Sequence, residues 1–169
     1  MMVASMNPCP CGYYGHPTKR CTCTPGQVQR YMSRVSGPLL DRIDLHIDVQ
    51  PVDFDQMSST ADGEPSEAIR ERVVAARAIQ NMRFAAYPDV HCNAQMTPAM
   101  IRQFASPDQA GLAKLKDAMT RLNMSARAYD RILKVARTIA DLEGSETVEK
   151  QHIAEAIGYR NLDRDNWAG

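Results

Sequence analysis

Two pairs of cysteines near the start of the chain constrain its fold most strongly. Cys9 and Cys11 lie in Asn-Pro-Cys-Pro-Cys-Gly, and Cys21 and Cys23 lie in Lys-Arg-Cys-Thr-Cys. Four thiolates within fifteen positions suffice for one tetrahedral metal ion, and zinc suits such a soft set of donors best. A segment with so few apolar residues also needs a cross-link of this kind to remain ordered. The spacing predicts a zinc-binding module over residues 7–23.

The cysteines alone leave other interpretations open. They could be free thiols in a flexible loop, or they could form a redox pair. His16 lies between the two pairs and could replace a cysteine that fails to reach the ion. Cys92 lies far along the chain beside His91, and a lone cysteine is more often a small apolar filler than a metal ligand.

The composition favours packed helices and a cytoplasmic protein. The chain has 169 residues, of which ten are methionines, 44% are hydrophobic and only 6% are aromatic, which is typical of helix-on-helix packing. No apolar run approaches the ~18 residues of a membrane span, and residues 1–6 lack the regions of a signal peptide. A formal net charge of zero argues against a strongly cationic nucleic-acid binder, although it allows a local basic patch. We expect no membrane partner.

The first third of the chain combines a helix and a strand with the cysteine module. A capping box that starts at Thr24 predicts a helix over about 25–35. Apolar residues alternate with polar ones over 43–49, which predicts a strand with one apolar face, ended by Pro51. Residues 53–65 contain Asp, Ser, Gly and Pro and are typical of a linker.

The remainder of the chain shows the spacing of a helical bundle. A helix is expected from Ser66 to about residue 83, and a short one from Thr97 to Phe104. Three more are expected after a capping box at 106–109, between Ser125 and Gly144, and after a cap at Thr147. The predicted organisation is a remnant of a larger core with the cysteine module, a linker, a helical domain and a tail, over residues 1–52, 53–65, 66–161 and 162–169.

Three strings resemble the magnesium chelatase-like AAA+ ATPases of the ComM/YifB type. They are Met-Asn-Pro-Cys-Pro-Cys-Gly with the second cysteine pair, Ser-Gly-Pro-Leu-Leu-Asp-Arg-Ile-Asp over 36–44, and the run over 122–141 that begins Leu-Asn-Met-Ser-Ala-Arg. The resemblance covers nearly the whole chain. It implies a mainly α fold, the C-terminal part of a AAA+ module, with an incomplete α/β sheet remnant, a cysteine-rich metal knuckle and a helical lid.

The resemblance also implies roles for three residues. Asn7 matches the sensor asparagine that orients the attacking water, Arg42 matches the arginine finger, and Arg127 matches the second sensor in the lid. Phosphoryl transfer develops charge on the γ-phosphate, which a guanidinium stabilises, and an amide both donates to and accepts from water. From the residues alone, Arg42 could instead pair with a neighbouring aspartate, Asp41 or Asp44, and Arg127 could be an ordinary surface residue.

Two motifs of a complete ATPase are absent from the sequence. No Gly-x-x-x-x-Gly-Lys-[Ser/Thr] occurs, and no apolar run ending in Asp-Glu precedes Asn7. We therefore expect a C-terminal fragment that does not hydrolyse ATP alone, whose partner is the N-terminal part of the same protein, and whose parent binds ATP and magnesium. The apolar face of the strand at 43–49 is expected to be poorly covered, or covered by a non-native partner.

Two functions of different classes are compatible with these features. The resemblance implies a hexameric ring ATPase that processes DNA during natural competence, with this chain supplying sensor and arginine-finger residues. The alternative is a zinc-stabilised module that binds nucleic acid or protein without any motor role. Lys19 and Arg20, at the tip of the cysteine module, are candidate contacts to nucleic-acid phosphate in either case.

Overall fold

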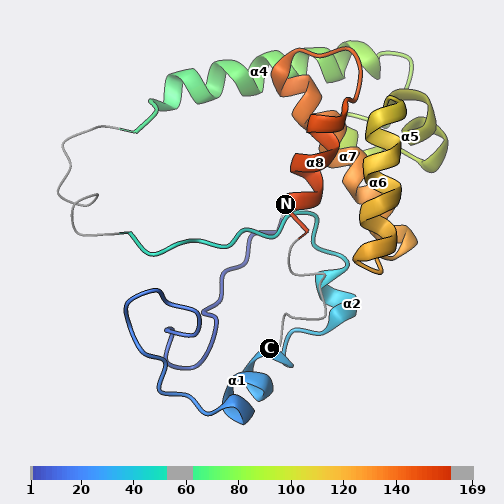
Figure 1. The fold of residues 1–169 in the computed structure, drawn as a ribbon. Coiled ribbons are helices and arrows are strands. Elements are labelled where there is room, and N and C mark those ends of the chain that lie inside the picture. The colour runs from blue at the N-terminus through green and yellow to red at the C-terminus, as the bar shows by residue number, and fades with distance from the viewer. Residues whose placement is uncertain (1, 53–62, 161–169) are drawn as a thin grey trace.

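The computed structural model describes residues 2–52 and 63–160, and within these ranges the chain is mainly helical, as predicted (Figure 1). Its only β interaction there is an isolated bridge between Pro107 and Val148. The helices are α1 (Pro25–Met32), α2 (Gly37–Leu40), α4 (Ser66–Arg83), the 3-10 turn η1 (Asn93–Gln95), α5 (Pro98–Phe104), α6 (Gln109–Arg121), α7 (Ala126–Glu143) and α8 (Lys150–Gly158).

Helix α7 lies at the centre of the bundle. It contacts α4, η1, α5 and α8, and α6 packs against α8 as well. One face of α7 is apolar, and Ile132 and Ala136 on that face are fully buried together with Leu115 of α6 and Ile153 of α8. The N-terminal half of α4 extends past the other helices (Figure 1). Amphipathic helices thus bury their apolar faces in one common core.

A buried ionic network fixes the ends of the long helices to one another. Asp141 is fully buried and binds two guanidinium groups, those of Arg83 and Arg137. Arg137 also donates to the carbonyl oxygens of Ser145 and Glu146, at 2.5 and 2.9 Å, in the turn after α7. Burial lowers the pKa of Arg137, and the charge of Asp141 opposes this shift. Carboxylate and carbonyl partners therefore compensate for the desolvation of both cations.

Several predicted helix boundaries are confirmed. The capping box at Thr24 is present, and Ser125 caps α7 by accepting from the N–H of Ala128. Gly144 ends α7 with φ of +72°, a left-handed conformation that glycine adopts without a steric penalty. Thr97 caps α5 by accepting from the N–H of Met100.

Three other boundaries differ from the predictions. Helix α1 ends at Met32 rather than near residue 35. The cap of α6 is Asp108, not Ser106, because its carboxylate accepts from the N–H of Gly111 at 2.6 Å. The last helix is capped by Glu149 instead of Thr147, in a reciprocal box with His152.

The prediction of a strand over residues 43–49 is wrong. This segment is irregular and has no β partner among the described residues. Its backbone bonds to the end of the bundle instead, because the N–H of His46 donates to the carbonyl of Tyr159 at 2.7 Å. The apolar face is poorly covered, as expected, with Ile47 and Val49 exposed by 68% and 84%. The segment therefore has the alternation of a strand without the neighbouring strand that would form a ladder.

Two further predictions fall on parts of the chain that are not described. Most of the predicted linker (53–62) and the predicted tail (162–169) lie outside the described residues, as does residue 161. The rest of the linker, residues 63–65, leads directly into α4. None of the helices in the described part of the chain combines the length and apolar character that crossing a bilayer requires.

Candidate functional site

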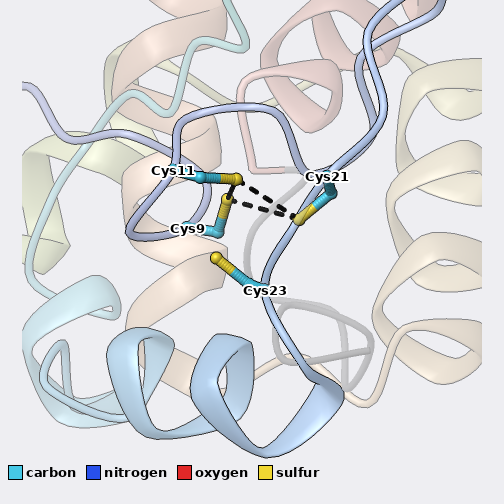
Figure 2. Close-up of side chains that lie close together, drawn as sticks. All are labelled: Cys9, Cys11, Cys21 and Cys23. Atoms are coloured by element: carbon cyan, nitrogen blue, oxygen red, sulfur yellow. Dashed lines mark hydrogen bonds between the residues drawn. The ribbon is translucent and has the colours of Figure 1, made fainter.

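The side chains of the four paired cysteines converge on one point (Figure 2). Their sulfur atoms all lie within 4.8 Å of one another, and the Sγ–Sγ distances from Cys9 to Cys11 and Cys21 are 3.3 and 3.7 Å. None of these cysteines forms a disulfide. Four sulfurs bound to one zinc ion at ~2.3 Å would lie about 3.8 Å apart. The cluster therefore fits a tetrahedral zinc ion.

A tight turn and a helix bring the two pairs together. The N–H of Gly12 donates to the carbonyl of Cys9 at 3.0 Å, and Gly12 has φ of +82°, which reverses the chain directly after the first pair. After the second pair, Thr24 begins α1 at once. Val28 and Met32 of this helix are buried against the cysteines. The module thus consists of residues 7–32 and has its own small core.

Hydrogen bonds and burial give the thiols unequal acidities. Backbone N–H groups of Tyr13 and Thr22 lower the pKa of Cys11 to about 5. The N–H of Cys23 lowers the pKa of Cys21, but desolvation and the neighbouring thiols outweigh this effect and raise it to about 12. The Cys11 thiolate is thus among the groups that disfavour ionisation of Cys21 and Cys23. A divalent cation would remove this conflict, because it stabilises all four thiolates.

The other candidate ligands make different contacts. The Nδ1 atom of His16 accepts from the backbone N–H groups of Thr18 and Lys19, at 3.2 and 3.1 Å, so the imidazole orders its own loop. Cys92 has its Sγ 3.7 Å from the amide oxygen of Gln95. Among the described residues, the group that could hold a metal consists of the four paired cysteines alone. A closed set of four protein ligands is typical of a structural zinc site.

Arg42 follows Asp41, the residue that caps the end of α2, and is exposed. Its guanidinium donates to the carbonyl of Pro38 at 3.0 Å, one turn earlier in the chain. Asp41, at the end of α2, accepts from the hydroxyl of Ser125 and lies 3.6 Å from Arg160. Among the described residues, Asp41 thus pairs with Ser125 and Arg160 and not with Arg42, contrary to the alternative in which Arg42 binds this aspartate.

Asp44 is also engaged elsewhere, because it forms an ion pair with Arg131 of α7. Two further contacts hold the same segment against the bundle. Arg160 donates to the carbonyl of Ile43, and the N–H of His46 donates to the carbonyl of Tyr159 at 2.7 Å. Residues 36–46 are thus anchored on α7 and the end of α8 through groups that surround the arginine.

Sequence reasoning missed this anchoring network. Asp41, Asp44, His46 and Arg160 were not among the predicted functional residues. A signal was present, because two carboxylates flank Arg42 in Leu-Leu-Asp-Arg-Ile-Asp. The spacing indicated a partner for the carboxylates, but it could not indicate that the partners lie more than eighty residues away.

Arg127 lies in the first turn of α7, exposed, two residues after the Ser125 that binds Asp41. The contacts of Asp41 therefore bring the segments of Arg42 and Arg127 together. Arg127 lines an open groove of about 660 Å³ along with Arg131 and Lys134. These three cations are spaced four and three residues apart and hence share one face of the helix. Asp44, Asp130 and Glu155 line the same groove, and Arg131 pairs with Asp44, so the charges along the groove are balanced.

The remaining predicted residues lie in or beside the cysteine module. Asn7 is exposed, and its side chain lies beside Gly12. Lys19 and Arg20 are exposed in the loop between the cysteine pairs, with the ammonium of Lys19 located 5.1 Å from the ring centroid of Tyr13. The contacts found in the described ranges do not join Asn7 to Arg42 or Arg127.

Comparison with known proteins relates both halves of the chain to one family. Residues 63–160 match the family described as "Magnesium chelatase, subunit ChlI C-terminal", and residues 1–57 match "Magnesium chelatase, subunit ChlI". The first match alone covers more than half of the chain.

Curated relatives align along almost the whole chain. The uncharacterized protein YifB of Escherichia coli and the competence protein ComM of Haemophilus influenzae are each 40% identical to it over 164 residues. An uncharacterized protein of Mycobacterium tuberculosis is 33% identical over 159 residues. These alignments cover 94–96% of this chain but only 31% of each relative, so the chain spans about a third of their length. The chain belongs to the magnesium chelatase ChlI-like family, together with YifB and ComM.

Proposed function

We propose that this chain supplies sensor and arginine-finger residues to a hexameric AAA+ ATPase that processes DNA during competence. The observation that carries the proposal is the anchoring of residues 36–46. Asp41 and Asp44 bind α7 and the end of α8, so neither carboxylate neutralises the exposed Arg42 between them. One relative is named a competence protein, which supports the biological setting.

Arg42 is the residue to which we assign the largest catalytic effect. Its guanidinium reaches the nucleotide of a neighbouring subunit and stabilises the charge that develops on the transferred phosphoryl group. Guanidinium groups in this role contribute about 10³–10⁵-fold to turnover. ATP and magnesium bind to the remainder of the parent protein, since the phosphate-binding motif is absent from this sequence.

Arg127 and Asn7 complete the assignment. Arg127, in the first turn of α7, senses the γ-phosphate, and the contact between Ser125 and Asp41 couples its position to that of Arg42. Asn7, just before the first cysteine pair, orients the attacking water through its amide. A zinc ion on Cys9, Cys11, Cys21 and Cys23 supplies structural support to the segment that follows Asn7.

The direct test is Arg42→Ala in the full-length parent protein. We expect ATP turnover to fall by about 10³-fold or more while the affinity for ATP remains unchanged, because the finger acts on a nucleotide held by other residues. Arg102→Ala is the matched control, since Arg102 is an exposed arginine on α5. Full turnover by the Arg42 variant would overturn the proposal.

A second function is favoured by one observation, the exposed Lys19 and Arg20 on the cysteine loop. A zinc-stabilised module could bind nucleic acid or protein without a motor role. Such a module would bind its partner equally well with or without Arg42. The Arg42 variant therefore separates the two functions when turnover and DNA binding are measured side by side.

A further inference from the structure

The first forty residues carry a net positive charge, whereas the rest of the chain carries a net negative one. They contain four basic residues and no Asp or Glu, whereas residues 41–169 contain 16 basic and 20 acidic residues. A zinc ion with four thiolates has a net charge of −2, so the segment remains positive with the metal bound. The basic residues are Lys19, Arg20, Arg30 and Arg34, and all four are exposed. This end of the chain is therefore suited to a polyanion.

The loop between the cysteine pairs adds exposed aromatic rings to this charge. Tyr13 and Tyr14 are exposed by 38% and 42%. Gly12 and Gly15, with φ of +82° and +76°, bracket the two tyrosines. The cysteine cluster fixes both ends of the loop, since it lies between Cys11 and Cys21. The rings are thus presented on a short, doubly anchored loop.

The two tyrosines have different surroundings. Tyr13 is engaged within the loop, because Lys19 lies 5.1 Å from its ring centroid and His16 packs edge-on at 5.6 Å. Tyr14 makes none of the ring contacts found among the described residues. Tyr13 therefore positions the ammonium of Lys19, and Tyr14 offers an open aromatic surface on the same loop.

An open aromatic ring on a loop that also carries cations can distinguish single-stranded DNA from a duplex. Cations contact phosphates of either form, but a ring stacks on a base only where that base is not already stacked in a helix. We propose that the loop over residues 12–20 binds single-stranded DNA, with Tyr14 stacking on a base and Lys19 and Arg20 contacting adjacent phosphates. The choice of DNA over RNA rests on the proposed function; the preference for a single strand rests on the loop itself.

The test measures binding by fluorescence anisotropy, with the 169-residue chain loaded with zinc. The probes are a labelled oligo(dT), a duplex hairpin of equal length and an oligo(U), each at two salt concentrations. We expect the chain to bind oligo(dT) at least about tenfold more tightly than the hairpin. Tyr14→Ala should reduce affinity for oligo(dT) by about tenfold or more, and affinity for the hairpin by less than twofold.

Lys19→Ala provides the contrasting variant. It should weaken binding to both DNA forms and reduce the slope of affinity against salt by about one. Tyr129→Ala and Lys116→Ala, which remove an exposed tyrosine and an exposed lysine from the bundle, are controls that should bind like the unmodified chain. Zinc content, measured for every variant, confirms that the loop has folded.

Three results would overturn the proposal. These are no binding to oligo(dT) by the zinc-loaded chain, equal losses on oligo(dT) and hairpin for Tyr14→Ala, and tighter binding to oligo(U) than to oligo(dT). The readout is independent of the motor assignment, because it requires no ATP hydrolysis. If the loop does not bind oligo(dT) as predicted but the Arg42 variant has lost ATP turnover, only this inference falls. If the loop binds as predicted but the Arg42 variant keeps full turnover, only the motor assignment falls.

Discussion

The helical bundle and the cysteine module are held together in different ways. In the described residues, the bundle core contains thirteen buried apolar residues, whereas the module core contains Cys9, Val28 and Met32 with the other cysteines around them. Ordering each residue costs about 1–2 kcal/mol in backbone entropy. The bundle offsets this cost through apolar burial, but three buried side chains cannot do so for residues 7–32. We therefore expect the module to depend on a bound metal for its order, and the bundle to be independent of it.

The largest effect is expected from removing two thiols at once. The double variant Cys9→Ser, Cys21→Ser should lose zinc and the amide protection of residues 7–32, because metal binding supplies most of the module's folding free energy. The bundle should keep its amide protection. Hydrogen exchange followed by mass spectrometry measures both regions in one sample.

Cys92→Ser is the control for the cysteine variants, since Cys92 lies outside the cluster. It should retain zinc and protection in both regions. A double variant in which the module stays protected without zinc would contradict the dependence on metal.

The next largest effect concerns the bundle alone. Asp141→Ala leaves Arg83 and Arg137 without their shared carboxylate in a site where Arg137 is only 2% exposed. Breaking a buried pair in this way costs about 3–5 kcal/mol. Urea unfolding of the zinc-loaded chain should show this loss, while the zinc content remains unchanged.

Asp117→Ala is the matched control, because Asp117 pairs with Arg121 on the exposed surface of α6. Its expected cost is below about 1 kcal/mol. Equal losses for the two variants would mean that the buried network does not stabilise the bundle.

A smaller effect is expected in residues 36–46, which belong to neither core. The double variant Asp41→Ala, Asp44→Ala removes the contacts with Ser125, Arg160 and Arg131. Because both carboxylates are partly exposed, we expect a loss of about 1 kcal/mol and faster hydrogen exchange confined to this segment. Asp48→Ala, which alters an exposed aspartate nearby, is the control. Faster exchange throughout the bundle would contradict a local anchoring role.

An effect of similar size, confined to one side chain, is expected from the cap of α7. Ser125→Ala removes the hydroxyl that accepts from the N–H of Ala128 and donates to Asp41, at a cost of about 1 kcal/mol. Ser125→Thr retains a hydroxyl and should recover most of the stability in urea unfolding. Similar losses for both variants would mean that the hydroxyl is unimportant.

Local signals predicted the bundle and the cysteine cluster well. The spacing of Ile132 and Ala136, the cap at Ser125 and the stop at Gly144 are all properties of a short stretch of chain, and the structure confirms them. The cysteine pairs were identified for the same reason, because the ligand type and spacing are visible in the sequence.

Features that depend on distant partners could not be predicted. The alternation over residues 43–49 indicated a strand, but a strand forms only where another backbone completes its hydrogen bonds, and here His46 bonds to Tyr159 instead. Likewise, the sequence around Arg42 did not show that Asp41 binds Ser125 of α7. Both failures arise because long-range contacts, not local patterns, decide these positions.

The most direct test of the account is the zinc content of the purified 169-residue chain, combined with hydrogen exchange before and after chelation. We predict one zinc ion per chain, and loss of protection after chelation in residues 7–32 but not in α4–α8. A chain without zinc whose residues 7–32 are nevertheless protected would contradict the central claim that the metal orders this module.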